Sequence, residues 1–518
     1  PHLKTPPGKA VLDGAFFQVY NIYVYHPGGP PAGEERRFFM KRFLTILLTT
    51  LALAGLLCVT ASASSFDGAA QELSAIGMLK GGAGGFDLDK APTRAQAAIM
   101  LVRLFGAEEE AKAAYAAGDL KCPFTDVNET TAPFAAWLKD KGLASGTSET
   151  TFGASGPCTA KAYTIFLLRA LGYQDNVDFT SANAQEFALS IGLLDTSLFN
   201  GTFLRDDLVS MTYQALGTDL KDGSTYLLAS LIESGAVEEA AAKPITDKIE
   251  AYRALQSSGA AAAQGLDDSI DANVGMQLSL KGTDGGTPLD MTQKADAAVK
   301  GNIKMLLDKD LQMAMDMTVT VSDGEVTETE KMEYWLKDGT AYARSGEDAY
   351  QMPMGMGMDM EAFTALMDQA AGNTYAALLP FIDSITTRTS GGNTVYTLTL
   401  NDAFAGMLNG LMGQILGMLE AGLDMGMSFS LDSSTITYTV GQDGTLKSAA
   451  ADMALKADVS ASDGRDSLAV RVGADLDMTM DIKAMGKAVK ISFPDFSGFE
   501  EIIGGADGPT GIFGTAVY

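Results

Sequence analysis

Histidine is the side chain most suited to proton transfer near neutral pH, and this chain of 518 residues has only two, His2 and His26. Both lie in residues 1–39, a stretch that is rich in proline and glycine and has neither helical nor strand periodicity. Without histidine, a Ser-His-Asp triad, a Cys-His pair and a histidine-ligated metal site cannot be built. We therefore expect no catalytic residues, no cofactor and no metal in the folded part, and we expect that the protein is not an enzyme.

Methionines alternate with other residues in MPMGMGMDM, 352–360, and in QMAMDM, 312–317. Thioethers are ligands that Cu(I) prefers, so a copper site is one interpretation. Methionine is also flexible and polarizable, and it lines adaptable apolar surfaces. Because the methionines are spread along the second half of the chain, we favour an apolar cavity. The residues expected to line it are Met313, Met315, Met354, Met356, Met407 and Met412.

Charge and cysteine usage restrict the function further. The net charge of −28 argues against nonspecific binding of nucleic acid, whose backbone attracts cationic proteins. Carboxylates are abundant enough for a paired-acid glycosidase, but no pair stands out from the acidic surface. Cys122 and Cys158 could form a disulfide worth about 3 kcal/mol, or they could be two buried free thiols. Spacing does not distinguish these alternatives.

Three copies of a helix-loop-helix unit span 66–106, 124–173 and 179–216. In each copy a first helix ends at a glycine, a loop carries a phenylalanine, and a second helix follows. These positions are Gly77, Gly142 and Gly192 for the helix ends, and Phe86, Phe152 and Phe203 for the loops. In the first copy Thr93 and Gln96 match a capping box, which satisfies free backbone donors at a helix start.

The repeats resemble S-layer homology repeats in the segment GGAGGFDLDKAPTRAQAAIMLVRLFG, 81–106, and in the FTDV start of the second copy. The resemblance implies a pseudo-threefold helical bundle that binds secondary cell-wall polysaccharide or a peptidoglycan-linked glycan, commonly one with acidic ketal groups. By position, Arg94 with its cap Thr93, and Arg205, would contact the glycan. A guanidinium suits this role because its planar fork meets a carboxylate with two hydrogen bonds. The second copy has Ala160 at the arginine position.

Residues 40–63 have the layout of a secretory signal peptide: Lys41 and Arg42, an uncharged apolar run, and Ala-Ser-Ala before a cleavage point at Ser64. Cys58 would accept lipid in a lipoprotein signal, but Leu57 stands where such signals need a small residue. We interpret residues 1–39 as upstream nucleotide sequence translated into the chain. The mature protein is then expected to have no transmembrane span and to be secreted to the bacterial cell wall or cell surface.

The second half changes to a period of two. Alternating segments over 268–498, separated by Asp-Gly and Gly-Gly turns, predict an antiparallel sheet with one buried face, interrupted by helices around 359–386 and 402–421. The layout resembles LolA-like lipoprotein domains, which implies a curved sheet wrapped around helices and an apolar cavity. The glycine spacing after Asn401 would also suit a membrane helix pair. Because strands flank this segment and it is short, we favour a packed helix.

The predicted fold class is multidomain α + β, with an all-α bundle of three repeats followed by a curved antiparallel sheet with inserted helices. Residues 64–220 hold the repeats, 221–267 a helical connector with a linker at 257–265, 268–498 the sheet domain, and 499–518 a glycine-rich tail. Within the tail, IIGGADGPTGIF is similar to a segment of the β subunit of sodium-translocating decarboxylases. Because the mature chain has no membrane spans, pumping is not expected, and we favour a flexible tail or terminal strand.

These features together predict an exported cell-envelope protein that is anchored non-covalently to cell-wall polysaccharide through its repeats. The sheet domain would bind an apolar or lipid-like ligand. A purely structural surface-layer or envelope protein is the main alternative, and a wall-active hydrolase is a third.

Overall fold

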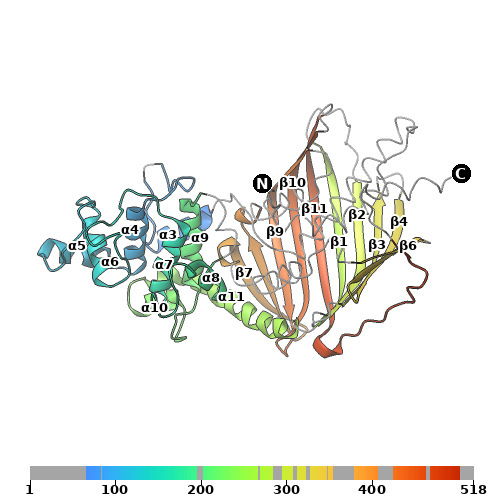
Figure 1. Ribbon diagram of the computed structural model, residues 1–518. Helices are drawn as coiled ribbons and strands as arrows, with labels where there is room; N and C mark the ends of the chain where they lie inside the picture. Colours follow the sequence, from blue (N-terminus) through green and yellow to red (C-terminus); the bar gives the residue numbers. More distant parts are fainter. Residues whose placement is uncertain are drawn as a thin grey trace, which may run out of the picture.

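The computed structural model describes residues 66–82, 84–194, 202–266, 269–283, 295–306, 312–322, 327–346, 348–353, 378–405, 424–462 and 467–501. Its helices come first along the chain and its strands second, and α11 runs from the helical part to the sheet (Figure 1). Residues 1–39, the predicted signal peptide and the segment IIGGADGPTGIF lie outside the described residues.

Each predicted repeat contains two helices, and α5 stands between the first and the second repeat. The helices are α3 (Asp67–Ala75), α4 (Arg94–Leu104), α5 (Glu108–Ala117), α6 (Ala132–Asp140), α7 (Ala160–Ala170), α8 (Ala184–Ser190), α9 (Arg205–Leu216), α10 (Leu227–Glu233) and α11 (Glu239–Leu266). Gly77, Gly142 and Gly192 follow the first helix of their repeats with φ of 80°, 69° and 71°. Glycine adopts this left-handed conformation without a steric penalty, which is why it ends these helices.

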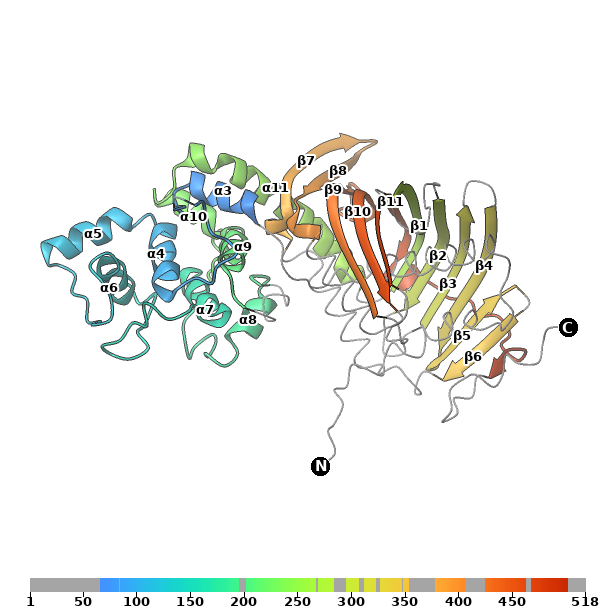
Figure 2. The ribbon, with the colours of Figure 1, turned by 90° about the horizontal axis from the view of Figure 1, so that it is seen from above.

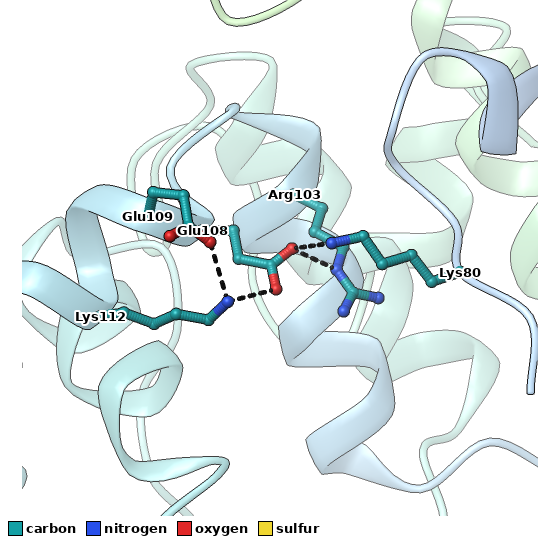
Figure 3. Close-up of polar contacts among 5 residues, drawn as sticks. All are labelled: Lys80, Arg103, Glu108, Glu109 and Lys112. Atoms are coloured by element: carbon teal, nitrogen blue, oxygen red, sulfur yellow. Dashed lines mark hydrogen bonds and ion pairs between the residues drawn. The ribbon is translucent and has the colours of Figure 1, made fainter.

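An ion-pair cluster joins α5 to the first repeat (Figure 3). Glu108 Oε2 accepts from Lys80 Nζ at 2.7 Å and from Arg103 Nε at 2.9 Å, while its Oε1 accepts from Lys112 Nζ at 2.8 Å. The Glu108 side chain is only 15% exposed. Burial raises its pKa, but the hydrogen bonds from Arg103, Lys112 and Lys80 outweigh that effect and hold the pKa well below its usual range. One carboxylate thus pairs with three cations within the chain.

The described strands form one twelve-stranded sheet in the order β12-β6-β5-β4-β3-β2-β1-β11-β10-β9-β8-β7. The strands are β1 (Ser269–Thr283), β2 (Ala295–Leu306), β3 (Gln312–Ser322), β4 (Thr327–Lys337), β5 (Thr340–Ser345), β6 (Asp348–Pro353), β7 (Ile382–Ser390), β8 (Asn393–Leu400), β9 (Asp424–Val440), β10 (Leu446–Ser462), β11 (Ser467–Met485) and β12 (Glu500–Glu501). Two consecutive meanders, β1 to β6 and β7 to β11, meet where β1 pairs with β11. All neighbours are antiparallel except β12 and β6, which confirms the predicted antiparallel sheet.

One face of the sheet is apolar and carries α11. Met276 and Leu278 of β1 and Leu476 of β11 belong to the same buried cluster as Ile249 and Tyr252 of α11. Seen from above, the sheet curves from β7 to β6, and α11 passes behind β9 and β10 (Figure 2). A single hydrophobic core therefore extends from the repeats into the sheet.

The other face is covered at β4 and β5 by the segment that follows the short helix η5 (Gly486–Ala488). Phe496 stacks on Tyr342 with ring centroids 3.7 Å apart, and Phe499 packs edge-on against Trp335 at 6.0 Å. Gln351 Nε2 donates to the Phe499 carbonyl at 3.1 Å. The segment between η5 and β12 thus packs against the edge of the sheet.

An aromatic contact joins the helical part to the segment before β7, and polar contacts join three helices to one another. Phe66 packs edge-on against Phe381 of η4 (Leu379–Phe381) at 5.2 Å. Lys248 of α11, whose side chain is 8% exposed, donates to both carboxylate oxygens of Glu72 on α3 at 3.0 Å. The hydroxyl of Tyr213 on α9 donates to the same carboxylate. This junction binds α3, α9 and α11 into one unit.

Two local predictions differ from the structure. Residues 257–265, expected as a linker, continue α11 as helix, because alanine has the highest helix propensity of all residues and the segment extends a helix that is already packed. Residues 382–386, expected as the end of a helix, begin β7, which pairs with β8 at an edge of the sheet. Of the predicted helix at 402–421, the described residues 403–405 are helical.

Candidate functional site

The second helix of the first repeat begins against the loop of the second repeat. Arg94 N donates to Gly156 O at 2.9 Å, and Ala95 N donates to Ala154 O at 3.0 Å. These bonds satisfy backbone donors that a helix start leaves free. They also bring the Arg94 side chain over the second loop, 51 or more residues away in sequence.

The Arg94 guanidinium is held in place but has no anionic partner among the described residues. It lies 5.1 Å from the ring centroid of Phe152 and 5.0 Å from that of Phe166, and its Nη2 donates to Ser145 O at 2.7 Å. Its Nε is buried without a hydrogen-bond partner, and no carboxylate of the described residues lies within ion-pair distance. Burial lowers its pKa, but a guanidinium stays charged in proteins. We call these four residues the Arg94 site.

Asp126 positions the loop that forms this site. Its carboxylate accepts from Phe152 N at 2.7 Å, Gly153 N at 2.7 Å and Ala154 N at 3.1 Å. Desolvation raises its pKa, but the three backbone donors have the larger combined effect, and the pKa of Asp126 is below its usual range. The FTDV motif of the second repeat contains Asp126, so the sequence contained a signal for this role, although we did not assign it.

Thr93 caps the helix that carries Arg94. Its hydroxyl accepts from Gln96 N at 3.3 Å, and its own N–H donates to Gln96 Oε1 at 2.9 Å. The capping box predicted from the sequence is therefore present. This cap fixes the start of α4 and with it the place where the Arg94 side chain leaves the backbone.

Arg205 occupies an equivalent position between the third and the first repeat, but it is paired. Arg205 N donates to Lys90 O at 2.9 Å, while Nη1 donates to Phe86 O at 3.2 Å and lies 3.3 Å from Asp87 Oδ2. Lys90 Nζ is 2.6 Å from the other oxygen of Asp87. The hydrogen bond and charge of Lys90, and to a lesser extent those of Arg205, hold the pKa of Asp87 below its usual range. We call Arg205, Phe86 and Asp87 the Arg205 site.

The third junction is built differently. The second repeat has Ala160 at the arginine position, and Tyr163 of α7 packs against Phe203 with ring centroids 6.2 Å apart. Phe86 precedes Arg94 by eight residues, and Phe152 precedes Ala160 by eight, whereas Phe203 precedes Arg205 by only two. Phe203 is therefore not the counterpart of the other loop phenylalanines, contrary to our expectation.

Cys122 and Cys158 are both free thiols in the structure, and Cys158 is buried whereas Cys122 is only partly buried. Cys122 Sγ contacts Phe124 O at 3.9 Å, and Cys158 Sγ contacts Thr159 O at 3.7 Å. Burial raises the pKa of Cys158 to about 11, although the Arg94 charge partly opposes this. The thiol is therefore neutral at ordinary pH and does not compensate the guanidinium.

Met313 and Met315 lie on the apolar face of the sheet, beside a small buried cluster formed by Ala272, Ile303 and Met305. Met313 pairs with Met305 across β2 and β3, and Met315 pairs with Ile303. Both methionines are only partly buried. The other residues predicted to line a cavity, Met354, Met356, Met407 and Met412, lie outside the described residues.

The part of the chain that the structure describes contains no helix long and apolar enough to cross a membrane and no group of side chains arranged to hold a metal ion. No protein-family model matches the chain, and no curated protein matches it. Among solved structures, the chain is similar to LprF from Mycobacterium bovis, with 11% identity over 48% of this chain and 98% of that chain and a TM-score of 0.25. This similarity is low, and the fold described above stands on its own strand order and packing.

Proposed function

We propose that the protein is an exported component of a bacterial cell envelope whose helical repeats bind an anionic cell-wall polysaccharide at Arg94. The observation that carries this proposal is a guanidinium held between two aromatic rings, with a free buried Nε and no carboxylate partner among the described residues. An uncompensated, half-buried cation is costly unless an anion completes the site. A carboxylate, such as that of an acidic ketal on a wall glycan, would complete it.

Sedimentation of the mature chain, residues 64–518, with purified cell-wall sacculi tests this proposal. Arg94→Ala is expected to weaken binding about tenfold or more, because a charge-assisted hydrogen bond contributes roughly 1.5–3 kcal/mol. Arg94→Lys should recover only part of the loss, since an ammonium lacks the planar fork. Lys161→Ala, which removes an exposed charge from α7, is the matched control. Binding of Arg94→Ala equal to that of the parent would exclude this site.

We propose as a second function that the sheet binds an apolar or lipid-like ligand on its methionine-rich face. The partly buried row of Met313, Met315 and Met317 on β3 supports this. Such side chains adapt to ligands of variable shape. We expect the mature chain to bind a fluorescent fatty acid. Met315→Asp should abolish this binding, whereas Asp316→Asn, on the opposite face, should keep it. Absence of uptake would favour a purely structural envelope protein.

A further inference from the structure

The Arg94 and Arg205 sites share one backbone frame. In each site, the backbone N–H of the first helix residue donates to the carbonyl of the residue four positions after the loop phenylalanine. The N–H of the second helix residue donates to the carbonyl two positions after that phenylalanine. For Arg205 and Asp206 these acceptors are Lys90 and Leu88, at 2.9 and 3.1 Å. The corresponding distances at the Arg94 site are 2.9 and 3.0 Å. Two arginines are therefore presented to two loops in the same way.

The sites differ at the residue that follows the loop phenylalanine. This residue is Asp87 at the Arg205 site and Gly153 at the Arg94 site, and both have positive φ, 52° and 81°. Aspartate is one of the few residues besides glycine that adopts this conformation. Asp87 uses it to place a carboxylate beside Arg205. An ideal Cβ on Gly153 would lie 3.1 Å from Thr147 Cγ2 and 3.5 Å from Arg94 Cδ, so a side chain there would stand beside the arginine.

We propose that Asp87 is a built-in anion that fills the Arg205 site, so that the chain binds a single carboxylate-bearing ligand, at Arg94. The residue after the loop phenylalanine decides which of the two sites binds. This inference rests on the proposed glycan-binding function for its biological meaning, but the occupancy of Arg205 by Asp87 does not depend on it.

Asp87 and an external carboxylate would compete for the same guanidinium, that of Arg205. An external carboxylate at Arg205 would have to displace Asp87, which is attached to the same loop and is also held by Lys90. At Arg94 no carboxylate of the described residues competes with an external one. Removal of the Asp87 carboxylate would leave Arg205 and Lys90 both unpaired beside Phe86, and this would create a second anion site with two cations.

A direct test follows the side-chain Nε–Hε signals of the arginines by NMR in the mature chain while sodium acetate is added at low ionic strength. In the parent, the Arg94 signal should move, and the Arg205 signal should respond at least about tenfold more weakly. In Asp87→Gly and Asp87→Asn, both signals should move. In Gly153→Asp the Arg94 signal should stop responding, while Gly153→Asn, which keeps the shape without the charge, should still respond. An Arg205 signal in the parent that responds as strongly as Arg94 overturns the proposal.

Sacculi binding separates this inference from the proposed function. If Arg94→Ala abolishes binding, then Arg94→Ala with Asp87→Gly should recover it through Arg205, and a further Arg205→Ala should remove it again. Failure of the double variant to bind acetate at Arg205 overturns the inference and leaves the role of Arg94 intact. Acetate binding at Arg205 without sacculi binding by any variant, the parent included, supports the inference and overturns the wall-anchoring function.

Discussion

The helical repeats and the sheet are held together by different kinds of contact. In the repeats, single polar side chains bridge distant segments. Asp126 accepts hydrogen bonds from a loop 26 to 28 residues away, and Glu108 accepts hydrogen bonds from three cationic side chains. In the sheet, long backbone ladders set the register, and methionines face one another across neighbouring strands, as Met276 and Met478 do. The repeats therefore depend on individual residues, whereas the sheet depends on a pattern that many residues can supply.

The largest effect is expected from Lys248→Met at the junction of α3, α9 and α11. The substitution leaves the Glu72 carboxylate without its cation in a partly buried place, and we expect a loss of about 3 kcal/mol in the free energy of unfolding. Urea unfolding measures it. Lys243→Met on the same helix removes an exposed pair with Asp247 and should cost at most about 0.5 kcal/mol. Equal losses in the two variants would contradict the importance of the buried pair.

Glu108→Ala should have the next largest effect, about 1–2 kcal/mol, because it leaves Arg103 half-buried without its acceptor. Thermal unfolding followed by circular dichroism measures the change. Glu109→Ala is the matched control, since Glu109 is the next residue, pairs with Lys112, and is 87% exposed. A control variant as unstable as Glu108→Ala would mean that the cluster acts through helix charge rather than through specific pairing.

Asp206→Asn tests the repeats through pH. Burial raises the pKa of Asp206 from 3.8 to about 7, although Phe66 N donates to its carboxylate at 2.7 Å. The native state therefore holds the proton more tightly than the unfolded state, so this contribution to stability is complete below pH 3.8 and is lost as pH rises through about 7. Asp206→Asn keeps a carbonyl acceptor for Phe66 and should gain stability relative to the parent between pH 4 and pH 7. Parallel stability curves for the two proteins would show that Asp206 does not titrate in this range.

The smallest effect is expected in the sheet. Met315→Leu keeps the volume and the apolar character of the side chain beside Ile303 and Tyr334, so the free energy of unfolding should change by less than about 1.5 kcal/mol. Differential scanning calorimetry measures the change. A loss as large as that of Lys248→Met would show that the methionine face is as residue-specific as the repeats.

Local patterns predicted the elements that local chemistry controls. The Thr93 cap, the glycines that end the first helices, and the period-two strands all depend on neighbours within a few residues, and the structure has each of them. The linker prediction at 257–265 was wrong because small residues in sequence suit both a flexible linker and a helix. Packing of Ile249 and Tyr252 into the core favours the helix there.

The alternation of residue types along the chain predicts two helices per repeat followed by an antiparallel sheet, and it marks Arg94 and Arg205 as matching positions. The difference between these two arginines arises from contacts that form only in the folded protein. Arg205 meets Asp87 across 118 residues, while Arg94 meets Ser145, 51 residues on, and no carboxylate among the described residues. A guanidinium's availability depends on which charges the fold brings within a few ångströms, and contacts between repeats are not encoded in the spacing within either one.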